Sequence, residues 1–126
     1  MKGLTAEWMA KAEEDYSVAT GLMRRRKVPA DSICFHSQQA AEKFLKAVLQ
    51  ECGIHFGKTH DLEGLLQLCM AVFPQLTLLV GDAKLLNDYA VRYRYPGIDA
   101  TKKQAKLAVT AAGRVRRTVL PLLKSL

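Results

Sequence analysis

The chain has 126 residues, of which 49% are hydrophobic and 25% are charged, and its formal net charge is +7. This length fits one domain over residues 1–126, and the apolar content excludes a disordered tail. Three cysteines without CxxC spacing exclude a disulfide framework and are typical of reduced thiols in a cytoplasmic protein. The first residues contain no apolar stretch, so we expect no secretory signal.

Apolar residues recur at three- and four-residue spacing and no segment alternates with period two, so we predict an all-α protein. The expected helices cover residues 5–26, 31–52, 81–93 and 99–123, with a third helix that starts at residue 59, 60 or 61 and ends before Pro74. Short connections favour antiparallel neighbours, and therefore an up-and-down bundle of four to five helices. The expected helix ends are an N-cap at Thr5, His60 with Glu63, and Asp99 or Thr101, and a stop at Gly53.

The first helix is expected to bury one face, formed by Leu4, Trp8, Ala12, Tyr16, Ala19 and Met23. It ends in a basic run, Arg24, Arg25, Arg26 and Lys27. Cations are favoured at a helix C-terminus because they interact with the helix dipole. We therefore interpret this run as a helix end rather than as an arm that binds nucleic acid.

Residues 64–81 carry no charge, and their number is near the minimum of about 18 for a membrane-spanning helix. Pro74 should divide this segment in two, and Gln67, Gln75 and Thr77 interrupt its apolar character. We therefore expect a core helix, a turn and a second short apolar piece, and no membrane span.

The second helix carries a polar stripe in which His36, Gln39, Lys43 and Gln50 recur at helical spacing. Their donors and acceptors suit a phosphate or a base edge, but they suit a solvated surface or a dimer interface equally well. Gln38 lies within the apolar arc, so its amide needs partners, and we expect it to bond to a neighbouring helix. The three histidines have no carboxylate or cysteine at a metal-ligand spacing, so no metal or other cofactor is expected.

Charge is distributed unevenly along the chain. The first 99 residues hold twelve basic and twelve acidic residues, whereas residues 100–126 hold seven basic and no acidic ones. On the last helix Lys103, Lys106, Arg114 and Arg117 share one face. The opposite face is apolar: Leu107, Ala108, Ala111, Val115, Val119 and Leu122. The basic face is either solvated or a surface for a polyanion or an acidic partner.

A second polar concentration ends the fourth helix, where Arg92, Tyr93, Arg94 and Tyr95 alternate. Arginine supplies donors for phosphate, and tyrosine supplies a face on which a base can stack. Alternatively, the tyrosines pack and the arginines pair with acids such as Asp88. The first interpretation gives a set of candidate residues for binding a nucleotide or RNA: His36, Gln39, Lys43, His60, Arg92, Arg94 and Tyr95.

Several blocks of sequence resemble the HEPN domain family in its stand-alone prokaryotic form. They are Trp8 with Asp15, CFHSQQAAEK from Cys34 to Lys43, KTHDL from Lys58 to Leu62, and RYPG from Arg94 to Gly97. The resemblance spans nearly the whole chain and implies a helical bundle that commonly forms homodimers. It also implies a role with a nucleotide or RNA, often beside a minimal nucleotidyltransferase in a toxin–antitoxin-like pair.

Ribonuclease members of this family carry an Arg-x4-6-His motif late in the bundle, but the last histidine of this chain is His60. RNA cleavage without a metal needs a group with a pKa near neutrality to move the 2′-hydroxyl proton. We therefore predict a non-catalytic protein that binds a nucleotide, RNA or a nucleotidyltransferase partner. The alternatives are a metal-independent ribonuclease that combines Arg92 or Arg94 with His60 across a dimer, and a simple dimerisation module.

Overall fold

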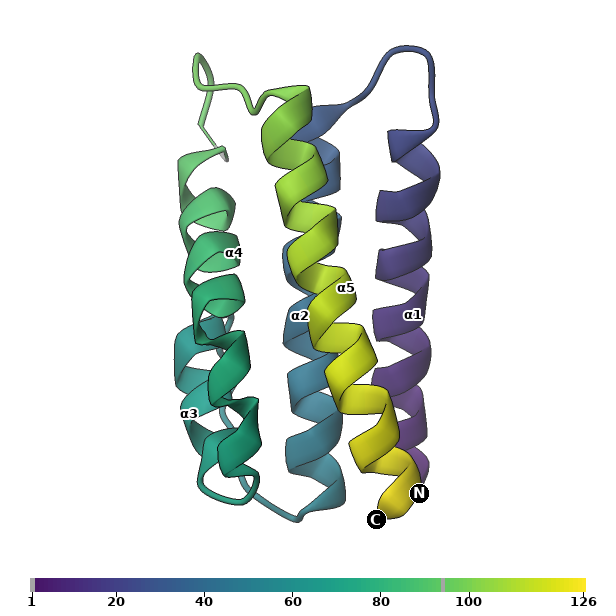
Figure 1. Ribbon diagram of the computed structural model, residues 1–126, viewed down its shortest axis with the longest axis vertical. Coiled ribbons are helices and arrows are strands. Elements are labelled where there is room, and N and C mark those ends of the chain that lie inside the picture. The colour runs from purple at the N-terminus through teal and green to yellow at the C-terminus, as the bar shows by residue number, and fades with distance from the viewer. Residues whose placement is uncertain (1, 94) are drawn as a thin grey trace.

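A computed structural model describes residues 2–93 and 95–126 of the chain, and within these ranges all regular secondary structure is helical, with no strand. The elements are α1 (Gly3–Met23), α2 (Ala30–Glu51), α3 (Leu62–Met70), the 3-10 helix η1 (Pro74–Leu79), α4 (Val80–Arg92) and α5 (Lys102–Ser125). The long helices run up and down beside one another (Figure 1). The prediction of an all-α bundle is confirmed.

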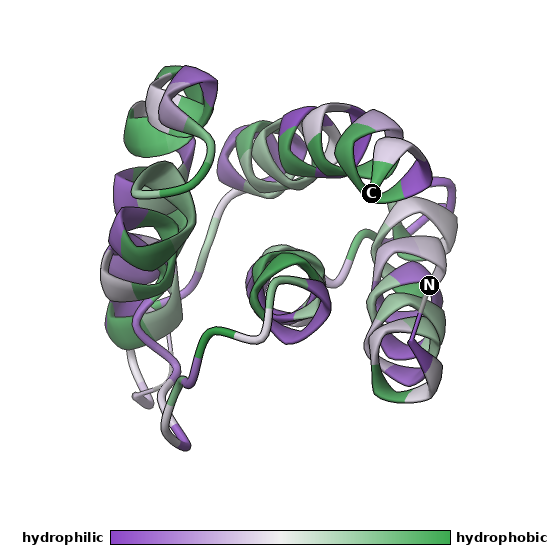
Figure 2. Ribbon diagram, turned by 90° about the horizontal axis from the view of Figure 1, so that it is seen from below, coloured by the Kyte–Doolittle hydropathy of each residue, from purple (hydrophilic) through white to green (hydrophobic). Residues whose placement is uncertain are grey.

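Helix α2 is the centre of the bundle. Seen end-on, it has α1 on one side, α5 on the next and α3 with α4 on the third (Figure 2). Its side chains are buried almost without interruption along its second half: Ala40, Ala41, Glu42, Phe44, Leu45, Lys46, Ala47, Val48 and Leu49. The alanines let neighbouring helices approach closely, while the larger residues fill the space between them. No helix of the described residues covers the fourth side of α2 (Figure 2).

The caps of α5 and α3 test two of the expected helix starts. The expected cap at Thr101 is confirmed, and the expected cap at His60 is wrong. At the start of α5, Thr101 accepts a hydrogen bond from the Gln104 N–H (3.1 Å) and Gln104 accepts one from the Thr101 N–H (2.8 Å), which is a complete capping box. The prediction that His60 caps the third helix is wrong. Asp61 caps α3 by accepting from the Glu63 N–H at 3.1 Å, because the imidazole of His60 is bound elsewhere.

The first helix differs from the expectation in its start and in its buried face. It begins at Gly3, so Thr5 lies inside the helix and is buried rather than acting as the N-cap. Leu4 is 57% exposed, and the buried line runs instead through Thr5, Met9, Ala12 and Ala19. Trp8 is only partly buried, at the edge of the core, where its ring meets Phe56 edge-on with 6.0 Å between centroids.

Four further predictions concern the helices, and the structure agrees with all of them except the one for Leu107. Leu107, expected on the apolar face of the last helix, is 42% exposed because it projects away from α2, whereas Ala108, Ala111 and Val115 are buried. Gly53, at φ +69°, follows the end of α2 as predicted. Pro74 separates α3 from η1, so the uncharged segment is divided as expected. No helix in the described ranges is both long and apolar enough to cross a bilayer.

Replacing Phe44 with alanine should lower the free energy of unfolding by about 3–5 kcal/mol, because the fully buried ring would leave a cavity between α2 and its neighbours. The matched control is Phe35→Ala on the same helix, where the ring is 54% exposed and the loss should stay below about 1 kcal/mol. Denaturant unfolding followed by circular dichroism measures both. Equal losses would contradict the assigned face of α2.

Candidate functional site

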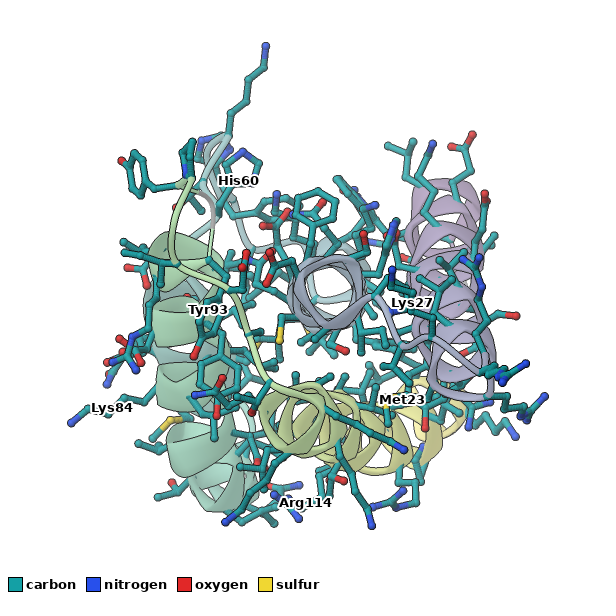
Figure 3. All side chains as sticks on the ribbon, turned by 90° about the horizontal axis from the view of Figure 1, so that it is seen from above. Met23, Lys27, His60, Lys84, Tyr93 and Arg114 are labelled. Atoms are coloured by element: carbon teal, nitrogen blue, oxygen red, sulfur yellow. The ribbon has the colours of Figure 1, made fainter. Side chains whose placement is uncertain are left out.

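A groove lies between α2, the start of α3 and the last turns of α4. Its volume is about 720 Å³, and its lining is Phe35, Gln38, Gln39, His60, Asp61, Asn87, Ala90 and Val91. Viewed from above, His60 lies on the side of α2 that no helix covers (Figure 3). The groove therefore lies along the uncovered side of α2, where its polar side chains Gln38 and Gln39 form part of the lining.

A buried carboxylate organises the wall of this groove. The Glu42 side chain is only 3% exposed, and its Oε2 accepts a hydrogen bond from Lys46 Nζ at 3.0 Å. Its Oε1 accepts one from His60 Nδ1 at 2.9 Å and one from Gln38 Nε2 at 3.3 Å. Gln38 also donates to the backbone carbonyl of His60 at 3.2 Å. A charge buried this deeply requires such partners, which together fix the segment before α3 against α2.

The same contacts orient the imidazole of His60. A carboxylate only accepts, so the hydrogen bond from Nδ1 to Glu42 places the ring proton on Nδ1 when the imidazole is neutral. The His60 side chain is 78% exposed, so Nε2 is presented to solvent as an acceptor.

Glu42 belongs to the CFHSQQAAEK block, yet its role was missed because a glutamate next to a lysine is typical of a solvated pair. Only its burial reveals the function of its charge.

Two further groups complete the polar lining. Asn87 of α4 donates to Asp61 Oδ1 at 2.8 Å and accepts from the Leu62 N–H at 2.9 Å, which joins α4 to the start of α3. Gln39 donates to Gln38 Oε1 at 2.8 Å. Asn87 was not a candidate from the sequence. Its spacing from the buried Ala83 and Leu86 placed it close to the packed face of its helix, and this was the available signal.

The predicted polar stripe divides between two places. Gln39 lines the groove with His60, but His36 and Lys43 turn toward α1, where both hydrogen-bond to the carboxylate of Asp15. The distance from His36 Nδ1 to Asp15 Oδ1 is 2.9 Å. The His36 and Lys43 side chains remain 29% and 21% exposed, so they border the open side of α2 as a cluster that ties it to α1.

The arginine–tyrosine corner is partly engaged in structural contacts. Arg92 pairs with Asp88 one turn earlier at 2.9 Å, and both side chains are about half exposed. Tyr93 meets the buried Tyr89 edge-on, with 5.5 Å between ring centroids, and burial is the main cause that raises the pKa of Tyr89. Tyr95 is 60% exposed. Arg94 lies outside the residues that the structure describes.

The basic residues of α5 do not line the groove. Lys103, Lys106 and Arg117 are exposed on the outer side of the bundle. Arg114 instead makes a bidentate contact with Asp82 of α4 (Nε to Oδ2 3.1 Å, Nη2 to Oδ1 2.8 Å), and these hydrogen bonds raise its pKa. Within residues 2–93 and 95–126, no three His, Cys, Asp or Glu side chains gather as a metal-binding cluster.

Comparison with known proteins connects this arrangement to a family. The sequence model of the HEPN domain matches residues 5–123. The chain belongs to the HEPN family. A search of the curated proteins found no match. The HEPN fold is also shared with two crystal structures: ST0689, an archaeal HEPN homologue, and TT1696 from Thermus thermophilus.

The two structural comparisons cover nearly the full length of every chain involved. ST0689 is 28% identical, with a TM-score of 0.74 over 94% of this HEPN chain and 96% of its own. TT1696 is 25% identical, with a TM-score of 0.74 over 94% of this chain and 97% of its own. The family resemblance drawn from the helix-two block and KTHDL is therefore confirmed.

Replacing Glu42 with alanine should lower the free energy of unfolding by about 3–5 kcal/mol, because Lys46 would remain buried without its carboxylate. The double variant Glu42→Leu with Lys46→Met should recover most of that loss, since both charges are then gone. Denaturant titration measures the stability of each. Glu14→Ala, at an exposed position of α1, is the control and should change little. A loss below about 1 kcal/mol for Glu42→Ala would contradict the assigned role of this buried pair.

Proposed function

We propose that this HEPN protein binds a nucleotide or a single-stranded RNA segment in the groove between α2, α3 and α4, and that it does so in the cytoplasm without cleaving the ligand. The observation that supports this is the chemistry of the groove. Phe35, Ala90 and Val91 provide apolar surface, while Gln39, Asn87 and His60 provide hydrogen-bonding groups. A volume of about 720 Å³ lies within the usual range for small-molecule sites.

The electrostatics of the groove favour the base and ribose over the phosphate. Asp61 lines the groove, and the Glu42 carboxylate lies directly behind His60, so a phosphate inside would meet negative charge. A neutral base instead can stack on the exposed ring of Phe35 and bond to side-chain amides. The phosphate then lies outside, toward Arg92, which follows Val91 at the end of α4 and is half exposed.

The orientation of His60 also favours the alternative function, a metal-independent ribonuclease. A histidine held through Nδ1 by a carboxylate presents Nε2 for proton transfer, as in many general bases. Such a reaction would combine His60 with Arg92 or Arg94, across a dimer if necessary. The chain lacks the Arg-x4-6-His motif of the family's ribonucleases, so we place binding first. Incubating RNA with the wild type and with His60→Ala separates the two functions.

Partners belong to the same proposal. HEPN domains commonly dimerise, and Phe35 and Val91, which are 54% and 61% exposed, give the groove an apolar rim that a second protein can cover. We propose a homodimer, with a minimal nucleotidyltransferase as a further partner in a toxin–antitoxin-like pair. A dimer without a ligand would correspond to the simple dimerisation module.

Phe35→Ala should weaken binding of a short fluorescent single-stranded RNA by about fivefold or more, because stacking of a base on an aromatic ring contributes about 1–3 kcal/mol. Gln39→Ala should weaken it as well by removing a hydrogen bond to the base. Leu78→Ala, 62% exposed on η1 outside the groove, is the control and should bind like the wild type. Fluorescence anisotropy measures all four proteins, and unchanged affinity in both groove variants would refute the proposed site.

Light scattering at micromolar concentration should give the mass of a homodimer. Val91→Lys should shift the population toward the monomer if the apolar rim lies in the interface, because a charge would then be buried without a partner. Lys84→Glu, at an exposed position on the same helix, serves as the control. A strictly monomeric mass for the wild type would remove the dimer from the proposal.

A further inference from the structure

The turn between α1 and α2 lies against the start of α5, although the two segments are far apart in the sequence. Ala19 of α1, Ile33 of α2 and Ala105 of α5 form a small buried cluster, with Met23 and Val28 packed around it. The Ala100 N–H also donates to Asp31 Oδ1 at 2.7 Å, which fastens the start of α5 to the start of α2. Figure 1 shows both segments at the same end of the bundle, and Figure 3 looks onto that end.

This arrangement joins two basic segments that the sequence keeps about 75 positions apart. We name the combined surface the basic end; it consists of Arg24, Arg25, Arg26, Lys27, Lys102, Lys103 and Lys106. All seven residues are exposed, and none forms an ion pair with a carboxylate in residues 2–93 and 95–126. The nearby acids are Asp31, which accepts from Ala100, and Asp99, which is exposed.

Folding alone does not account for this surface. Arg24–Lys27 follow the C-terminus of α1, where the helix dipole favours cations, so the first half of the basic end has a structural explanation. The helix dipole does not explain the position of Lys102 and Lys103. They occupy the first turn of α5, which contains no acidic residue, and there the dipole disfavours cations. Bringing both sets together adds repulsion between like charges.

We propose that the basic end binds the phosphate backbone of a double-helical nucleic acid. Lysine and arginine neutralise phosphates without reading sequence, and three guanidinium groups in a row can each donate two parallel hydrogen bonds to a phosphate. No aromatic residue occurs within residues 17–34 or 99–126, so no ring stands between these cations on which an unpaired base could stack. The exposed rings next to these ranges, Phe35 and Tyr95, belong to the groove and to the α4–α5 connection. A duplex keeps its bases stacked inside and presents only its backbone, which is the ligand that such a surface fits.

A membrane surface fits less well. Basic surfaces that bind lipid usually also insert apolar side chains between the headgroups. Here Leu22, Met23 and Val28 are half-buried in the cluster beneath the turn. Arg116 and Glu13 close the next part of the α1–α5 seam with a bidentate ion pair, so the free positive charge is concentrated at the end of the bundle. This inference is independent of the groove, which is lined by α2, α3 and α4.

The test compares two triple variants that remove the same charge. Arg24→Gln/Arg25→Gln/Arg26→Gln alters the basic end, whereas Lys11→Gln/Lys84→Gln/Lys124→Gln alters exposed positions elsewhere. Binding of a short fluorescent DNA duplex is measured by anisotropy over a salt titration. The logarithm of the affinity falls with the logarithm of salt by about 0.9 per phosphate contacted, so the arginine variant should flatten this slope by about 2 to 3. It should also bind at least about tenfold more weakly at low salt, with an unchanged circular dichroism spectrum.

The control variant should keep nearly the wild-type slope and affinity, and Phe35→Ala should keep duplex binding while it loses single-stranded RNA. These two results would separate the basic end from the groove. Equal losses in the two triple variants would mean that only total charge matters, and the proposal would be wrong. Binding to vesicles with anionic lipid but not to the duplex would overturn it in favour of a membrane surface.

Discussion

The buried carboxylate of Glu42 is the interaction on which the groove depends. It lies on the central helix, where water cannot compensate its charge, so the surrounding chain must supply hydrogen-bond donors. Lys46 supplies one from the same helix, and His60 supplies another from the segment before α3. This requirement holds the segment across the open side of α2 and presents the imidazole at the surface. At the other end of this network, the rings of Trp8 and Phe56 pack against the ammonium of Lys46. The distances from Nζ to the two ring centroids are 5.3 Å and 5.9 Å.

Two surfaces with different chemistry result from one helical arrangement. The groove combines apolar side chains, amides and one imidazole with acidic groups behind them, which is the basis for proposing a neutral, planar ligand. The basic end is exposed and strongly positive, which is the basis for proposing that it binds phosphate without reading a base. If both proposals hold, the protein holds a duplex by its backbone and an unpaired base in the groove.

Much of the fold could be predicted from local patterns. Helical periodicity, Gly53, Pro74 and the Thr101 capping box depend on residues that are close in the sequence, and the structure agrees with each of them. The candidate site could be predicted only in part. Gln39 and His60 were recognised as polar residues in unusual places, and both line the groove. His36 and Lys43 looked equivalent to Gln39, but helix geometry turns them toward α1, where Asp15 binds them.

By itself, the sequence determined the helical class and the excess of positive charge in the last helix, because these follow from composition and short-range spacing. The family followed from the likeness of particular blocks, CFHSQQAAEK and KTHDL, to known HEPN proteins. Only the tertiary structure decided what the polar residues do. Whether Glu42 is solvated or buried, whether Asn87 reaches Asp61, and whether Arg24–Lys27 share one end of the bundle with Lys102 all depend on how the helices pack. Side chains far apart in the sequence acquire a common environment only when the core brings their helices together. The low dielectric of the core then strengthens each buried ion pair and hydrogen bond.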